Sequence, residues 1–159
     1  MADHPSSAPL ITRRRLLGLG VVAIASGYVG WRQLTAAPLY AGGSLEVRAA
    51  HKSVTSGDVM LIDIRRPDEW KRTGTPQGAH LLDMRREDFA SVLTEIAAGD
   101  TDRPIALICA RGVRSARTSL RLSAAGFTNI IDVPEGMLGS RAGPGWLKQN
   151  LPTDVYPKG

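Results

Sequence analysis

Three short apolar segments, separated by segments with helical periodicity, constrain the fold of this chain most. They span residues 59–64, 104–109 and 128–133, and each has the length of a β-strand. Strands this apolar are typical of parallel sheets, in which helices cover both faces. In residues 86–98 and 115–125 the apolar side chains recur at spacings of three and four, which predicts amphipathic helices. The alternation predicts an α/β protein with a parallel sheet.

Length and composition limit the number of domains and the kinds of binding site that the chain can have. Residues 45–159 are numerous enough to bury one such core, and residues 32–44, with Pro38, Gly42 and Gly43, are predicted to be a linker. The single cysteine excludes an internal disulfide and a Cys/His zinc site, and no metal or cofactor is expected. Aromatic residues make up 5% of the chain, too few for surfaces that stack the bases of single-stranded nucleic acid. No nucleic-acid partner is therefore expected.

Residues 1–31 have the layout of an export signal. The arginines at 13–15 precede the charge-free residues 16–31, and a basic segment followed by an apolar one directs export. Residues 12–17 resemble a twin-arginine export signal, although Gly18 stands where that signal often has lysine. The leader is therefore predicted to carry the rest of the chain out of the cytoplasm.

The final location depends on what happens to this leader. Its apolar stretch is shorter than the ~20 residues of a comfortable spanning helix, and no clear cleavage site accompanies it. A cleaved signal and an uncleaved anchor therefore both remain open, as does a buried helix. Arginines before an apolar segment stay on the cytoplasmic side. The domain at residues 45–159 is thus expected in the periplasm, either exported or anchored to the inner membrane by the N-terminal segment.

The segment from Ile105 to Ser115 carries the candidate chemistry. An apolar strand ends in Cys109, a short loop with one glycine and two arginines follows, and a helix begins. Ligands of α/β proteins bind at the carboxyl ends of the strands, where loop N–H groups and a helix N-terminus attract anions. Arg111 and Arg114 keep their charge at physiological pH. These effects favour the thiolate of Cys109, which would be a nucleophile beside an anion-binding loop.

Each of these residues also has an ordinary interpretation. A lone cysteine after an apolar strand is most often a small buried hydrophobic residue, and single arginines are most often solvated side chains. The placement of two guanidinium groups directly beside the cysteine favours the reactive interpretation, because an inert core position gains nothing from them.

The sequence resembles the single-domain rhodaneses, a family of sulfurtransferases, over residues 46–152. Four motifs follow the order found in that family: a strand-and-Asp/Arg motif at 61–70, a second motif at 74–80, the cysteine loop at 109–115, and a turn at 133–137. The second motif is similar to Gly-His-Ile-Pro-Gly-Ala, with Thr75 and Gln77 as departures. The turn is similar to Glu-Gly-Gly and is followed later by Trp146. The resemblance implies a five-stranded parallel sheet flanked by helices on both faces.

The resemblance also implies residue roles. Cys109 would take a sulfane sulfur from a small anionic donor such as thiosulfate, hold it as a persulfide and pass it to cyanide, a thiol or another protein's cysteine. Asp63 and Arg65 would support the scaffold together with Glu69, which is expected to pair with Arg65. An arginine common in thiosulfate-using members is absent here, which leaves the preference for thiosulfate open. The donor would bind to the loop residues Ala110, Arg111, Gly112, Val113, Arg114 and Ser115.

Two other classes of function remain open. Related folds host phosphatases and arsenate reductases, whose loop has five residues between cysteine and arginine, whereas residues 110–113 separate Cys109 from Arg114. The shorter loop suits sulfur better than a tetrahedral phosphate. The second alternative is a sulfur carrier or a regulatory binding module without turnover, and the presence of Cys109 argues against an inactive module. Without a second cysteine, a persulfide would leave only by attack from an external nucleophile.

Overall fold

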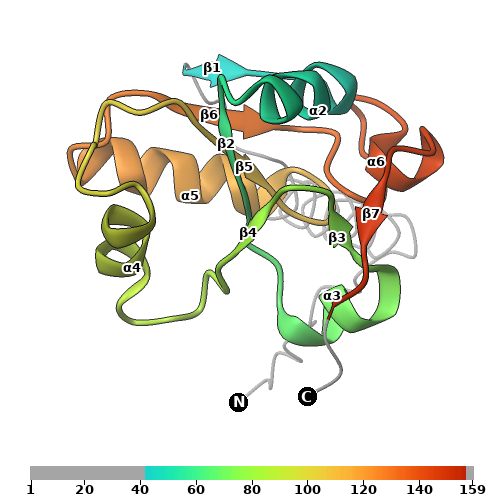
Figure 1. Cartoon of the computed structure of the whole chain (residues 1–159), viewed down its shortest axis with the longest axis horizontal. Helices are drawn as coiled ribbons and strands as arrows, with labels where there is room; N and C mark the ends of the chain where they lie inside the picture. Colours follow the sequence, from blue (N-terminus) through green and yellow to red (C-terminus); the bar gives the residue numbers. More distant parts are fainter. Residues whose placement is uncertain (1–41, 157–159) are drawn as a thin grey trace, which may run out of the picture. The chain divides into compact units, whose positions relative to one another are not determined.

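Five parallel strands form the central sheet. The computed structural model describes residues 42–156, so the predicted leader and most of the predicted linker lie outside the described residues. The strand order is β1-β6-β5-β2-β4 (Figure 1), and every neighbouring pair is parallel. The expected five-stranded parallel sheet is confirmed. The strand bounds are β1 Gly43–Ser44, β2 Met60–Asp63, β4 His80–Leu81, β5 Ile105–Ile108 and β6 Ile130–Val133.

Helices cover both faces of this sheet, which confirms the expected α/β architecture. Two core clusters form, one on each face. One cluster joins the sheet to α4 and α5, through Phe89 and Leu122, and the other joins it to α2 and α6, through Val47 and Trp146. The helix bounds are α2 Val47–Ser56, α3 Pro67–Thr73, α4 Phe89–Ile96, α5 Val113–Ala124 and α6 Gly145–Lys148.

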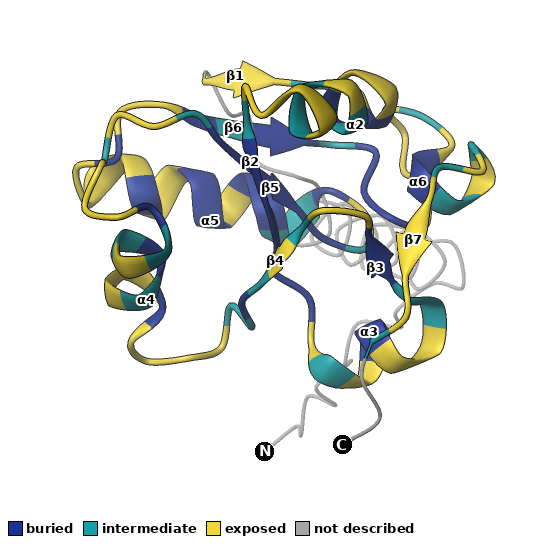
Figure 2. Ribbon diagram, in the orientation of Figure 1, coloured by how far each residue is buried: buried dark blue, intermediate teal, exposed yellow. Residues whose placement is uncertain are grey.

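The central strand β5 supplies both clusters by simple alternation. Successive side chains of a strand point to opposite faces of its sheet. Leu107 and Cys109 accordingly join the cluster under α4 and α5, whereas Ala106 and Ile108 join the cluster under α2 and α6. All four residues of the strand are buried, and Figure 2 shows the neighbouring strands β2 and β6 as mostly buried ribbons. The unbroken apolar segments of the sequence thus arise from burial on two faces.

The register of the strands brings their carboxyl ends to one edge of the sheet. Ile108 at the end of β5 pairs with Asp63 at the end of β2 and with Val133 at the end of β6. The loops that follow these strands therefore start side by side. Helix α5 begins at Val113, two residues before the predicted start, so the loop after Cys109 is shorter than expected.

Several elements have no clear sequence signal. Gly43 and Ser44, predicted to lie in the linker, form the edge strand β1. β3 (Thr75–Pro76) and β7 (Thr153–Asp154) form a separate antiparallel pair. Within the described part of the chain, no helix has the length and apolar character needed to cross a bilayer.

Candidate active site

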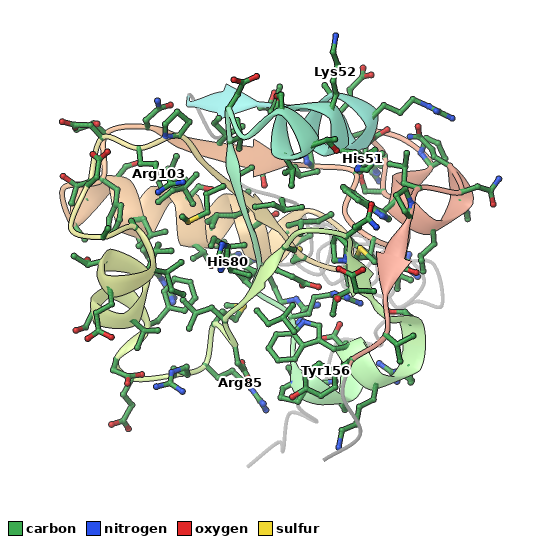
Figure 3. All side chains as sticks on the ribbon, in the orientation of Figure 1. His51, Lys52, His80, Arg85, Arg103 and Tyr156 are labelled. Carbon is green, nitrogen blue, oxygen red and sulfur yellow. The ribbon has the colours of Figure 1, made fainter. Side chains whose placement is uncertain are left out.

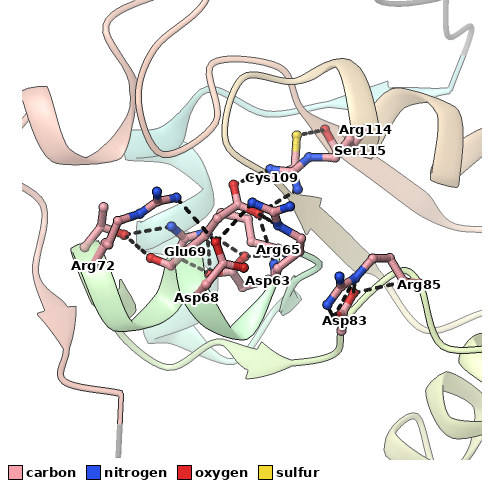
Figure 4. Close-up of polar contacts among 12 residues, drawn as sticks. Asp63, Arg65, Asp68, Glu69, Arg72, Asp83, Arg85, Cys109, Arg114 and Ser115 are labelled. Atoms are coloured by element: carbon pink, nitrogen blue, oxygen red, sulfur yellow. Dashed lines mark hydrogen bonds and ion pairs between the residues drawn. The ribbon is translucent and has the colours of Figure 1, made fainter. Parts of the chain in front are cut away.

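Cys109 directly follows β5 and lies at the carboxyl edge of the sheet. It is 1% exposed, and its thiol donates a hydrogen bond to Ser115 Oγ over 3.6 Å (Figure 4). Burial alone fits an inert core cysteine as well as a reactive one. The surroundings of the sulfur distinguish the two interpretations, because they contain polar groups that an apolar core position does not need.

The backbone of the loop after Cys109 provides the first of these polar groups. The N–H groups from Ala110 to Ser115 donate no hydrogen bond to any residue within 42–156. Gly112 lies in the left-handed region at φ 79° and immediately precedes α5. Consecutive N–H groups around such a turn, at the positive end of a helix, form a binding site for an anion or a thiolate.

A second segment closes one side of this loop. After β6 the chain turns at residues 134–136, and the N–H groups of Met137 and Leu138 donate to the carbonyls of Cys109 and Ala110, each over 2.9 Å. Backbone lies against backbone here, since a Cβ on Gly136 would come within 2.7 Å of the Ala110 carbonyl carbon and oxygen. The two segments, which resembled separate family motifs in the sequence, thus form one structure.

Arg114 contributes a charge beside the sulfur, and that charge is paired. Its guanidinium donates to both carboxylate oxygens of Glu69, at 2.6 and 2.7 Å. Burial would raise the pKa of Glu69, but the hydrogen bonds from Arg114 and the Arg66 N–H, with the charges of Arg114 and Arg65, lower it to about 2. The same hydrogen bonds raise the pKa of Arg114 against the effect of burial, and the charge of Cys109 adds to this. Arg114 therefore remains a cation next to the sulfur.

Arg111 behaves differently from Arg114. Its side chain is exposed, and it forms no ion pair with any residue of the described part of the chain. It is thus the loop's unpaired cation, at the surface side of the loop. An anionic donor that approaches the loop would meet Arg111 before it meets the buried sulfur.

Asp63 and Arg65 form a buried scaffold rather than part of the sulfur site. Arg65 Nη2 lies 2.7 Å from Asp63 Oδ2, and the same guanidinium donates to Thr73 Oγ1 and the Gly74 carbonyl. The expected pairing of Glu69 with Arg65 is wrong, because Asp63 occupies Arg65 from two residues away. Glu69, in the first turn of α3, pairs with Arg114 instead.

Two buried carboxylates near the loop were not predicted from the sequence. Glu135 accepts a hydrogen bond from the Val47 N–H over 2.6 Å and so caps the first turn of α2. Asp132 lies on β6, and burial raises its pKa to about 6 against the opposing effects of Ser115 and the Val133 N–H. The available signal for Asp132 was a lone carboxylate inside an apolar strand segment.

The described residues include two histidines, His51 and His80. His51 on α2 packs edge-on against Trp146, with ring centroids 5.5 Å apart, and His80 on β4 is exposed (Figure 3). Neither forms a hydrogen bond with Cys109. Across residues 42–156, no group of three His, Cys, Asp or Glu side chains lies together in a way that could hold a metal ion.

Comparison with known proteins adds to this geometry. The rhodanese-like domain family matches residues 46–141. An uncharacterized protein of Rickettsia prowazekii is 24% identical over 115 residues, which cover 66% of this chain and 90% of that protein.

Solved structures share the fold. The polysulfide-sulfur transferase homodimer of Wolinella succinogenes is similar at a TM-score of 0.53 and 25% identity, over 71% of this chain and 78% of that chain. The thiosulfate sulfurtransferase of Pseudomonas aeruginosa has a TM-score of 0.58 at 18% identity, over 74% of this chain and 21% of that chain. The second likeness shows the fold alone.

Proposed function

This chain belongs to the family of rhodanese-like domains, and we propose that it is a sulfurtransferase in which Cys109 carries a sulfane sulfur as a persulfide. One observation carries the proposal: the N–H groups from Ala110 to Ser115, beside the only cysteine, make no hydrogen bond within the described residues. Those of Val113, Arg114 and Ser115 belong to the first turn of α5, where N–H groups have no partner within the helix, and together with those of Ala110, Arg111 and Gly112 they form a cluster of donors that suits an anion. A thiolate, a persulfide and a sulfur oxyanion are all such anions.

The proposed reaction has two steps that place negative charge at the same point. In the first, the Cys109 thiolate attacks the outer sulfur of thiosulfate, a bond forms between Sγ and that sulfur, and sulfite leaves with the electron pair of the broken S–S bond. In the second, cyanide or an external thiolate attacks the terminal sulfur, and Sγ leaves as a thiolate. The loop N–H groups and Arg114 stabilise the charge on sulfur in both steps.

The charge of the loop bears on the donor. Arg114 is neutralised by Glu69, Ala110 carries no charge, and Arg111 is the remaining unpaired cation. We propose a small anionic sulfane donor, either thiosulfate or a polysulfide, the second because of the likeness to the Wolinella succinogenes polysulfide-sulfur transferase. The acceptor is external, since the chain has one cysteine.

The test is sulfur loading and transfer by the full-length chain. Incubation with thiosulfate or polysulfide is expected to add about 32 Da, one sulfur atom, to Cys109, and addition of cyanide to thiosulfate-treated protein is expected to produce thiocyanate. Cys109→Ser should lose both signals. A Cys109 that takes no sulfur from either donor, or hydrolysis of phosphate esters without sulfur transfer, would overturn the proposal.

One outcome of the same test concerns the sulfur-carrier alternative. A stable adduct on Cys109 without thiocyanate formation would indicate a sulfur carrier rather than an enzyme.

We also propose, from residues 1–31, that the protein is exported to the periplasm or anchored to the inner membrane. Fractionation of tagged full-length protein separates a cleaved, an anchored and a cytoplasmic form, and a cytoplasmic form would contradict export.

A further inference from the structure

The arginines near the Cys109 loop differ in whether they have an acidic partner. On one side lie residues 64–74 and 82–88, which follow β2 and β4, and there every arginine forms an ion pair with an aspartate; Figure 4 shows part of this network. The pairs are Arg65 with Asp63, Arg66 and Arg72 with Asp68, Arg85 with Asp83, and Arg86 with Asp88. On the other side lies the segment that follows β6, and its Arg141 is exposed, as is Arg111 of the Cys109 loop. Neither forms an ion pair with any residue within 42–156.

The sequence explains why this second side keeps its positive charge. Residues 103–131 and 136–153 contain no Asp or Glu. Between them lie two acidic residues, Asp132 and Glu135, and both are buried. The exposed charge that these segments carry is therefore entirely positive.

Leu138 connects the segment after β6 to the Cys109 loop. Its N–H donates to the Ala110 carbonyl over 2.9 Å, so Leu138 lies beside the backbone that leads into Arg111. The Leu138 side chain is 36% exposed and is one of three large apolar side chains that are exposed within the described residues. An apolar contact is thus available next to this cation.

Ser140 holds the turn that carries Arg141 against the same loop. The Ser140 hydroxyl donates to the Pro134 carbonyl over 2.7 Å, and a Cβ at Gly112 would overlap that carbonyl oxygen. Ser140 Oγ also accepts from the Ala142 N–H over 3.0 Å, so hydrogen bonds hold the residues on both sides of Arg141. Arg141 therefore extends from an ordered turn that is anchored next to Gly112.

We propose that Arg141, together with Arg111, binds the carboxylate of a small anionic thiol that accepts the sulfur from Cys109. The inference rests on the proposed function, because it requires a persulfide on Cys109. In the transfer step the thiolate of the acceptor attacks the terminal sulfur, and a bond forms between these two sulfur atoms. The bond from the terminal sulfur to Cys109 Sγ breaks, Sγ keeps the electron pair as a thiolate, and the acceptor leaves as a persulfide.

Charge and access both favour an acceptor of this kind. An attacking thiolate brings a second negative charge to a persulfide anion, and a carboxylate adds a third. Arg114 is neutralised by Glu69, so Arg111 and Arg141 are the cations at the surface of the loop that attract such a molecule. Cys109 is 1% exposed, and a small thiol reaches a recessed sulfur more readily than does a cysteine on the surface of a folded protein.

The experiment measures the transfer step alone, in the full-length chain. Cys109 is loaded from thiosulfate, excess donor is removed, and mass spectrometry follows the loss of one sulfur atom, about 32 Da, after a thiol is added. Mercaptosuccinate, which carries carboxylates, is compared with 2-mercaptoethanol, which carries none. Arg141→Ala is expected to slow transfer to mercaptosuccinate about fivefold, the effect of losing one exposed ion pair, and to leave transfer to 2-mercaptoethanol unchanged. Arg141→Lys should retain most of the wild-type rate.

Arg121→Ala is the matched control, since it removes an equal charge from an exposed position later on α5. It should match the wild type with both thiols, and high salt should reduce the effect of Arg141→Ala. Equal slowing of both thiols by Arg141→Ala, or unchanged transfer to mercaptosuccinate, would overturn this inference alone. Transfer from the loaded wild type to cyanide but to neither thiol would also overturn it, and would indicate a protein cysteine as the acceptor. Failure of wild-type Cys109 to load would overturn the proposed function and this inference with it.

Discussion

Arg114 and Glu69 form a two-pronged ion pair, with Nη1 2.7 Å from Oε2 and Nη2 2.6 Å from Oε1. The two residues are 45 positions apart in the sequence. The pair connects α3, which follows β2, to the start of α5, which follows β5. Arg114 lies in the first turn of α5, beside Cys109, so the orientation of this cation beside the sulfur depends on a carboxylate from α3.

Replacing Glu69 by Gln is expected to lower the free energy of unfolding at neutral pH by about 2 kcal/mol, because the partly buried Arg114 loses its counter-ion. The pKa of Glu69 falls from 4.5 to about 2 on folding, so the pair contributes fully above about pH 4.5 and its contribution disappears as the pH falls toward 2. Urea unfolding should show wild type and Glu69→Gln converging over this range. A difference that stays constant down to pH 2 would contradict the assignment.

Replacing Asp132 by Asn is expected to stabilise the protein above pH 6. The pKa of this carboxyl group rises from 3.8 to about 6 on folding, so the folded state prefers the neutral acid, and the wild type loses stability as the pH rises between these values. The loss is about 2 kcal/mol after allowance for solvent screening. Thermal unfolding at several pH values should show this loss in the wild type and a flat profile in Asp132→Asn. Parallel profiles would show that Asp132 ionises normally.

Gly112 and Gly57 offer a matched pair of glycines with left-handed φ angles of 79° and 80°. A Cβ at Gly112 would overlap the Pro134 carbonyl oxygen, whereas a Cβ at Gly57 meets nothing within 4 Å. Gly57→Ala should therefore cost only the ~1 kcal/mol of backbone strain. Gly112→Ala should cost about 3 kcal/mol or more and abolish sulfur loading of Cys109, because the loop must move away from residues 134–136. If urea unfolding shows that the two substitutions lower the free energy of unfolding equally, the loop after Cys109 and residues 134–136 are not in close contact.

Arg65 and Arg85 provide a similar comparison. Each forms a forked ion pair with an aspartate two positions earlier, but the Arg65 pair is buried and the Arg85 guanidinium is exposed. Arg65→Lys is expected to lower the free energy of unfolding by about 3 kcal/mol, since lysine cannot also reach Thr73 and Gly74. Arg85→Lys should leave it nearly unchanged. Neither change should move the pH profile of Cys109 alkylation, and a moved profile in Arg65→Lys would assign Arg65 to the site.

Arg111 is expected to act in donor binding. Arg111→Ala should raise KM for thiosulfate severalfold and leave kcat nearly unchanged, because an exposed charge attracts the donor without contacting the sulfur being transferred. This difference in KM between Arg111→Ala and the wild type should become smaller at high salt, because salt screens exposed charges. Arg121→Ala, an exposed arginine later on α5, is the control and should leave KM unchanged. A lower kcat at unchanged KM would place Arg111 in the chemical step instead.

The central sheet and the loop after Cys109 could be predicted because their signals are local. Segments 104–109 and 128–133 are apolar along their whole length, and strands buried on both faces require this. The cysteine, the glycine and the two arginines lie within six consecutive residues, 109–114. By contrast, α2 was not predicted, because it buries only Val47 and Ala50 and its other side chains are polar or partly exposed.

The ion pair and the buried acid could not be predicted because they depend on which strands become neighbours. Arg65 was the cation expected to pair with Glu69, but Asp63 pairs with Arg65, and β2 lies next to β5, which brings Arg114 to Glu69. The position of Asp132 behind Ser115 likewise follows from the pairing of β6 with β5. A local pattern specifies a strand and its ends, whereas the partners across the sheet come from the topology.

The carboxylate of Glu135 gives the molecule a built-in spectroscopic reporter. It holds the Val47 amide at 2.6 Å and directly precedes Gly136, the residue that packs against the Ala110 carbonyl. An amide proton in so short a contact with a negative charge resonates far downfield in a nuclear magnetic resonance spectrum. Arrival of a sulfur on Cys109 could thus be followed at Val47, on the opposite face of the sheet, without a dye or label near the reacting atom.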